Sequence, residues 1–266
     1  MLGMQTLIIL FVFFLGAIIA SFLSVVADRW GSASWVNGRS RCDHCAKHLR
    51  WFELIPLISY IAMRGRCMRC ASAVSSAYII GETIAGVGAV LLVYAFAATP
   101  AVLFCATIFF CLMYVVSRYD ARHMMVLHEL LIPAGVFALL THVALQALDA
   151  PLMVAWSLVS IQILLNGVFI IAPFWLVWRL SKGTKIGLGD IYVFIPLALL
   201  VSFQSFVALL LIASVLALVV ASFKSMVYRK HMTRTTQVPL VPYLTIAALL
   251  VMTLQFDILG IVSRFI

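Results

Sequence analysis

The chain has 266 residues, of which 65% are hydrophobic and 10% are charged, and its formal net charge at pH 7 is +9. A soluble globular domain carries about 25% charged residues, so the composition excludes a water-soluble enzyme or binding module. Apolar runs that reach the roughly 20 residues needed to cross a bilayer recur along the chain. The sequence therefore predicts an all-α, polytopic membrane protein.

Eight transmembrane helices are expected. The first apolar run lacks the basic start and the Ala-x-Ala cleavage site of a signal peptide, so we interpret it as a retained helix. The apolar stretch 191–223 is too long for one crossing, and the polar sequence SFQS at 202–205 divides it into two helices. The expected spans are 4–27, 77–98, 100–117, 130–149, 152–178, 190–202, 205–223 and 239–262.

The basic residues lie on alternate connections between these spans. If the N-terminus is outside, 17 of the 18 Lys and Arg residues fall on the inner side. Cytoplasmic loops carry such an excess, which predicts a multi-pass protein of a bacterial inner membrane. The positive charge then reflects topology and contact with anionic lipid headgroups, and it is not evidence for nucleic acid binding. The inner segments are 28–76, 118–129, 179–189 and 224–238.

The chain thus divides into a first transmembrane helix (1–27), a cytoplasmic segment (28–76) and a transmembrane core (77–266). The cytoplasmic segment is too small to form an independent hydrophobic core without a covalent or metal staple. No internal repeat or low-complexity tract is expected.

Two Cys-x-x-Cys motifs supply this staple. Cys42 and Cys45 precede Cys67 and Cys70 by 21 intervening residues, nearly the spacing of a four-thiolate zinc site. Four thiolates leave Zn²⁺ no open position for substrate, so the expected role is structural. A reducing cytoplasm disfavours disulfides, and a redox pair or free thiols are the alternatives.

Glu82 lies a few residues inside the second expected span. An acidic residue at that depth costs a few kcal/mol, which makes it a candidate for a functional site. The other interpretation is an interfacial glutamate paired with an arginine of the cytoplasmic segment. Both interpretations stay open at this point.

Two aspartates have matching positions at the inner ends of spans. Asp120 follows the third span, and Asp190 opens the sixth behind Gly187 and Gly189, whose lack of side chains allows a backbone or an extended substrate to come close. Two carboxyl groups that meet in a partly dry site share one proton, so that one can activate water while the other polarises a carbonyl. The alternative is that Asp190 favours its own helix N-terminus and that Asp120 pairs with a neighbouring arginine.

Several motifs together resemble the type IV prepilin peptidases, and the resemblance covers nearly the whole chain. Asp120 is followed by a proline thirteen positions later, as is the family's first catalytic aspartate, and Asp190 closes a Gly-x-Gly-Asp motif. The other matching stretches are ASFLSVVADR at 20–29, the two Cys pairs within 42–70, Glu82, and VPLVPYLTIA at 238–247.

This resemblance implies a bifunctional enzyme with Asp120 and Asp190 as its catalytic residues. Such an enzyme removes the basic leader of prepilin-like proteins after a glycine, then methylates the new N-terminus with S-adenosylmethionine. Methyl transfer is implied by the resemblance alone, because the chain has no Rossmann-type glycine motif and GETIAGVG at 81–88 indicates close helix packing. Glu82 is a candidate for the methyl-transfer site.

The chain departs from the family pattern at four positions near these motifs. His128-Glu129 replaces a Pro-Asp or Pro-Asn pair, Tyr192 stands where a lysine is frequent, and Ser24 replaces an asparagine. These departures bear on substrate preference. The alternative functions are a presenilin-like or preflagellin-type protease without methyl transfer, a proton-coupled transporter, and a zinc-bearing scaffold without activity.

Overall fold

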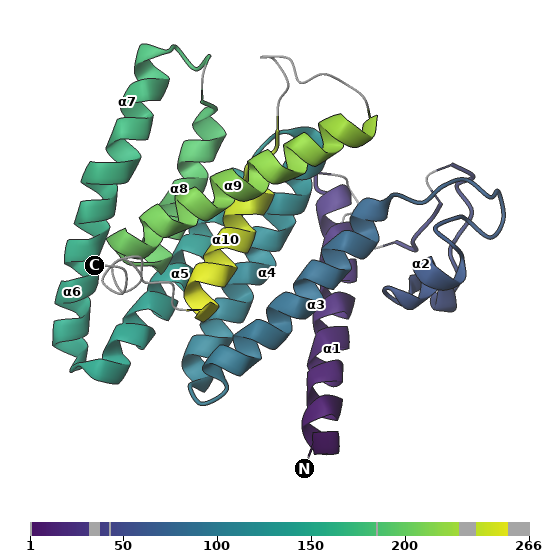
Figure 1. The fold of residues 1–266 in the computed structure, drawn as a ribbon, viewed down its shortest axis with the longest axis horizontal. Coiled ribbons are helices and arrows are strands. Elements are labelled where there is room, and N and C mark those ends of the chain that lie inside the picture. Colours follow the sequence, from purple (N-terminus) through teal and green to yellow (C-terminus); the bar gives the residue numbers. More distant parts are fainter. Residues whose placement is uncertain (1, 32–37, 43, 185, 229–237, 255–266) are drawn as a thin grey trace. The chain divides into compact units, whose positions relative to one another are not determined.

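A computed structural model describes residues 2–31, 38–42, 44–184, 186–228 and 238–254 (Figure 1). Within these residues the regular structure is helical, with two isolated β-bridges and no strand. The expected all-α class is therefore confirmed. The helices are α1 (Leu2–Asp28), η1 (Trp51–Leu54), α2 (Ile58–Ala62), α3 (Ser76–Phe96), α4 (Pro100–His123), α5 (His128–Asp149), α6 (Leu152–Asn166), η2 (Gly167–Ile171), α7 (Ala172–Leu180), α8 (Leu188–Leu200), α9 (Phe203–Tyr228) and α10 (Val241–Leu254).

Six of the described helical stretches are long and apolar enough to cross a membrane. They comprise α1, α3, α4, α5, the continuous stretch from α6 through the π-helical turn η2 to α7, and α9. Two shorter apolar helices, α8 and α10, occupy the positions of the sixth and eighth expected spans. The chain is thus a multi-pass membrane protein, and the count of eight spans stays a prediction. The end of the last expected span, beyond Leu254, lies outside the described residues.

Helix α4 differs from the expected third span, because it continues past residue 117 to His123. The helix ends where Met124 adopts a left-handed conformation (φ 54°) and donates its backbone N–H to the carbonyl of Asp120 at 2.8 Å. Hydropathy marks where the apolar surface ends, whereas a helix can extend beyond it into polar surroundings. Asp120 therefore sits in the last turns of a helix and not in a loop.

The chain forms two compact units, residues 1–94 and 95–266. In the first unit, α1 and α3 approach closely at two glycines. A Cβ added at Gly16 would lie 2.9 Å from the carbonyl oxygen of Ala85, and one added at Gly86 would lie 2.8 Å from the ring of Phe13. Small residues allow such close helix packing in membranes. The interpretation of the 81–88 stretch as a packing motif is confirmed at Gly86.

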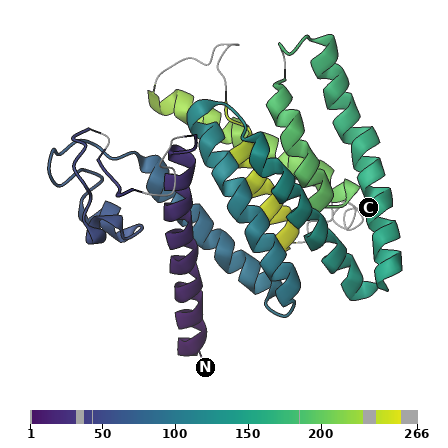
Figure 2. The same ribbon diagram turned by 180° about the vertical axis from the view of Figure 1, so that it is seen from behind.

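In the second unit, α5 packs against α4 and α8, and α10 contacts α4, α8 and α9 (Figures 1 and 2). Helix α8 has only 13 residues, and side chains from other helices satisfy the carbonyl groups at its C-terminal end. The amide of Asn166 donates to the carbonyls of Ala198 and Val201 at 2.9 and 3.1 Å, and His142 Nδ1 lies 3.0 Å from the carbonyl of Leu199. A helix end buried without such partners would be costly, so these contacts fix α8 in the unit.

Candidate active site and candidate metal centre

Asp120 is buried in the second unit, at the junction of α4 and α10. Its side chain is 5% exposed, and its Oδ2 accepts a hydrogen bond from the backbone N–H of Val241 at 3.2 Å. Val241 is the first residue of α10, so the carboxyl group lies at the positive end of that helix. One turn earlier, the hydroxyls of Ser117 and Thr245 are 2.8 Å apart and also join α4 to α10.

Asp190 occupies the first turn of α8 and is half-buried. Its carboxyl group is hydrogen-bonded to the backbone N–H of Gly187, the residue that caps the helix. A side chain at the third helical position that reaches back to the cap amide is half of a capping box. The expected helix N-terminal role of Asp190 is thus present, and it is compatible with a role in catalysis.

The two glycines before Asp190 have separate contacts. A Cβ at Gly187 would lie 3.3 Å from Asp190 Oδ2, and a Cβ at Gly189 would lie 3.0 Å from Val126 Cγ2. Val126 belongs to the link between α4 and α5, directly after the helix that carries Asp120. Gly189 therefore lets the start of α8 lie against the link that follows α4.

The two carboxyl groups lie close enough for their charges to interact. Both accept backbone N–H groups at helix N-termini, one from α10 and one from α8 itself. Each carboxylate thereby has a donor that stabilises it in partly apolar surroundings. Two carboxyl groups that share one site can act as an acid and a base, as hydrolysis by paired aspartates requires.

The four cysteines of the first unit form one cluster. Their Sγ atoms all lie within 4.8 Å of one another, and those of Cys42 and Cys70 are 3.8 Å apart. Zn–S bonds of about 2.3 Å in a tetrahedron place neighbouring sulfurs about 3.8 Å apart. The cluster can therefore hold a metal ion, and its dimensions fit zinc.

The two Cys motifs are local repeats of each other, which was not expected. Each reads Arg-Cys-x-x-Cys-Ala, and the alanines Ala46 and Ala71 both have a φ of 55°. In each repeat the alanine N–H donates to the carbonyl of the first cysteine at 2.9 Å, and the N–H of that cysteine donates to the carbonyl five residues later at 2.9–3.0 Å. The arginine and alanine flanking each pair were the signal that could have revealed the repeat.

The surroundings of the thiols favour thiolates at part of the cluster. Backbone N–H groups of Cys45 and His44 lower the pKa of Cys42 to about 6. A hydrogen bond from the Ser72 hydroxyl, 2.9 Å from Cys70 Sγ, lowers the pKa of Cys70.

Cys45 differs from its neighbours. Although the Lys47 backbone N–H favours its thiolate, burial and the adjacent Cys42 and Cys70 sulfurs raise the pKa of Cys45 to about 11. Crowded thiolates repel one another, and a bound cation would remove that repulsion.

Glu82 is buried in the first unit, with 6% of its surface exposed. Its Oε2 accepts the backbone N–H of Leu57 at 2.9 Å, and the Ser21 side chain is a second hydrogen-bonding partner. Leu57 has a left-handed backbone (φ 61°) and precedes α2. Among the described residues the partners of Glu82 are thus an amide and a hydroxyl, not an arginine of segment 28–76, and Glu82 anchors that segment to α3.

Two sequence-family models match this chain. One, described as the bacterial peptidase A24 N-terminal domain, matches residues 14–96, and the other, described as the type IV leader peptidase family, matches residues 107–222. The two matches are separate in the sequence and together include Glu82, both Cys pairs, Asp120 and Asp190. No solved structure matches the chain.

Three curated relatives illustrate the similarity, and each is named prepilin leader peptidase/N-methyltransferase. The protein from Myxococcus xanthus is 43% identical over 77 residues, or 29% of this chain and 23% of its own length. That from Dichelobacter nodosus is 30% identical over 39% of this chain and 37% of its own length. That from Xanthomonas campestris is 26% identical over 82% of this chain and 72% of its own length. The matches to the first two of these relatives thus span well under half of those proteins' length.

Proposed function

The chain belongs to the type IV leader peptidase family, and on that premise we propose that it is a membrane aspartic endopeptidase that cleaves prepilin-like precursors after a glycine and N-methylates the new N-terminus. The observation that supports the proposal is the pair Asp120 and Asp190, which lie at the ends of two helices of the second unit and each have a backbone amide as partner. A presenilin-like or preflagellin-type protease and a transporter are not favoured, because the curated relatives are named as peptidases that also transfer methyl groups.

Cleavage would proceed by attack of water between the two carboxyl groups. The ionised aspartate takes a proton from the water, whose oxygen then bonds to the scissile carbonyl carbon. The protonated aspartate donates to the carbonyl oxygen, and the C–N bond breaks as the leaving nitrogen gains a proton. Water can reach a peptide bond of the precursor only where the precursor helix unwinds. A glycine before the cleaved bond allows this local unwinding.

The basic connections support a position in the bacterial inner membrane with Asp120 and Asp190 at the cytoplasmic side. A prepilin-like precursor suits that site, since its basic leader would stay in the cytoplasm while its apolar helix remains in the bilayer. For the four-cysteine cluster we propose Zn²⁺ as the bound ion. Cys42, Cys45, Cys67 and Cys70 would hold it, and with four protein ligands it would stabilise the segment and take no part in hydrolysis.

The proposal is tested by incubating the purified protein with a precursor, with and without S-adenosylmethionine, and measuring product masses. We expect cleavage after the glycine under both conditions and a methylated N-terminus only when S-adenosylmethionine is present. An intact precursor under both conditions would refute the peptidase, whereas cleavage without methylation would refute only the second activity.

Glu82 is our candidate for the methyl-transfer site, where its carboxylate would take the proton that the amine loses on methylation. We expect Glu82→Gln to lower the methylation rate about tenfold or more and to leave the cleavage rate within about twofold. The glutamine keeps an oxygen that accepts the Leu57 N–H, so the anchor is preserved. Both rates are read from the mass assay. Normal methylation by Glu82→Gln, together with loss of both activities in Glu82→Ala, would make Glu82 a structural anchor instead.

Gly189 should be sensitive to the smallest added side chain. We expect Gly189→Ala to lower the kcat/KM of cleavage about five- to tenfold, because its Cβ would press on Val126 Cγ2 at 3.0 Å and displace Asp190. The matched test adds Val126→Ala, which removes that methyl group and should restore at least half of the loss. If the double variant is no better than Gly189→Ala, this packing contact does not position Asp190.

A further inference from the structure

The hydroxyl of Ser72 lies beside the four-cysteine cluster of the first unit. Its Oγ is 2.9 Å from Cys70 Sγ and 3.9 Å from Cys42 Sγ, and these two sulfurs are 3.8 Å apart. The hydroxyl thus lies against one sulfur of each Cys motif and is closer to Cys70. A thiolate has no proton, so when Cys70 is a metal ligand the hydroxyl donates the hydrogen bond and the sulfur accepts it.

This donor breaks the symmetry of the two Arg-Cys-x-x-Cys-Ala repeats. In both repeats the residue after the alanine, Lys47 or Ser72, donates its backbone N–H to the sulfur of the second cysteine. The side chains at this position differ, because Lys47 is exposed to solvent, whereas Ser72 is half-buried against the cluster. The second repeat therefore has a hydroxyl donor where the first has an exposed lysine.

The hydroxyl is placed at the ligand that water reaches most easily. Cys70 is exposed, whereas Cys67 is buried and Cys42 and Cys45 are partly buried. Four thiolates around a divalent ion leave an excess of negative charge on the sulfurs, and hydrogen bonds to the sulfurs stabilise that charge. Partners outside the ligands also hold a ligand in its orientation toward the metal. A fixed donor at the exposed sulfur would therefore oppose loss of the ion from that side.

We propose that Ser72 is a positioning residue of the metal centre, whose hydroxyl holds the Cys70 thiolate on the ion and slows release of the metal. The inference rests on the proposed zinc centre and adds to it a residue outside the four ligands. Partners of this kind typically contribute about 10- to 100-fold to metal affinity. The backbone N–H of Ser72 supports the same sulfur whatever the side chain, so a side-chain substitution isolates the effect of the hydroxyl.

The first test measures the rate at which the purified full-length protein releases zinc to a chromogenic chelator. We expect Ser72→Ala to release zinc about tenfold faster or more, whereas Ser72→Thr, which keeps a hydroxyl, should stay within about threefold of the unaltered rate. Ser59→Ala is the matched control, because Ser59 lies in α2, between the two Cys motifs in the sequence and outside the cluster. It should release zinc at the unaltered rate.

A second measurement reports on the ligand sulfur itself. With Co²⁺ in place of zinc, charge transfer from sulfur to metal gives an absorption band in the near ultraviolet. A hydrogen bond stabilises the electron pairs of the sulfur, so its loss in Ser72→Ala should move this band to longer wavelength, and Ser72→Thr should return it. A merely structural role of Ser72 would reduce the amount of bound Co²⁺ and leave the position of the band unchanged.

The outcomes separate Ser72 from the metal centre. If the unaltered protein binds neither Zn²⁺ nor Co²⁺, the proposed metal centre fails and the inference fails with it. If the unaltered protein binds both ions, but Ser72→Ala releases zinc at the normal rate or leaves the Co²⁺ band in place, only the inference fails. It also fails if Ser72→Thr behaves like Ser72→Ala, because the hydroxyl is then not the cause.

Discussion

Asparagine in place of either Asp120 or Asp190 should lower kcat/KM for precursor cleavage by about 10²- to 10⁴-fold, the usual contribution of a positioned acid or base. Asparagine keeps the size of the side chain and an oxygen that can accept the amide of Val241 or Gly187, so the helices should still assemble. It cannot exchange a proton with water or the scissile carbonyl. Initial rates with a purified precursor measure the effect.

The double variant should be little worse than either single one, because the two carboxyl groups act as one unit. Asp149→Asn is the matched control, since Asp149 is an exposed aspartate at the opposite end of α5 and should retain normal activity. Comparable amounts of each variant in the membrane fraction exclude a failure of insertion. Cleavage within a factor of ten of normal by either single variant would remove that residue from the catalytic pair.

Serine in place of Cys42 should reduce bound zinc from about one equivalent to less than about half, as measured by elemental analysis of the purified protein. Three thiolates would remain, and one corner of the tetrahedron would have no sulfur ligand. Cys42 is suited to this test because its sulfur lies 3.8 Å from that of Cys70, within the cluster. Structural zinc contributes about 10–16 kcal/mol of folding free energy in zinc-finger peptides. We therefore expect limited proteolysis to cut between the two Cys pairs in the variant much faster than in the unaltered protein.

Cys105→Ser provides the comparison, because Cys105 lies within α4 and outside the cluster. It should retain its zinc and its resistance to protease. Treatment of the unaltered protein with a strong chelator should reproduce the Cys42→Ser result. If the unaltered protein and the Cys42→Ser variant both contain no zinc and both resist protease, the two Cys motifs keep their fold without metal.

Residue types and spacing were sufficient to predict the helical class and the four-cysteine cluster. Apolar runs set the positions of the helices, and paired thiols at this spacing have few other uses. The stretch GETIAGVG at 81–88 was identified as a packing motif because small residues let membrane helices approach closely. These features depend on local pattern, which a single sequence contains.

Contacts between distant segments could not be predicted in this way. The amide that Asp120 accepts belongs to Val241, 121 positions later, and any non-proline residue provides an identical N–H group. The caps that Asn166 and His142 place on the end of α8 depend on where that helix stops inside the unit. The arginine partner considered for Glu82 was wrong within the described residues for the same reason, since Leu57 offers only its backbone.

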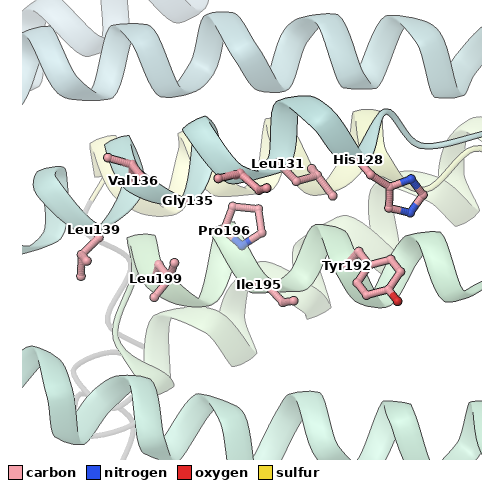
Figure 3. Close-up of a pocket in the computed structure, with 10 residues that line it drawn as sticks. His128, Leu131, Gly135, Val136, Leu139, Tyr192, Ile195, Pro196 and Leu199 are labelled. Carbon is pink, nitrogen blue, oxygen red and sulfur yellow. The ribbon is translucent and has the colours of Figure 1, made fainter.

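The main-chain support of the two carboxyl groups bears on how the enzyme could evolve. Side-chain replacement leaves an amide in place unless proline is introduced, so neighbouring positions can mutate while the hydrolytic frame persists. Positions 128 and 192 (Figure 3), which support neither aspartate through a described hydrogen bond, are then available for substitution. Such a division would let a lineage vary the side chains around the two aspartates while their backbone partners persist.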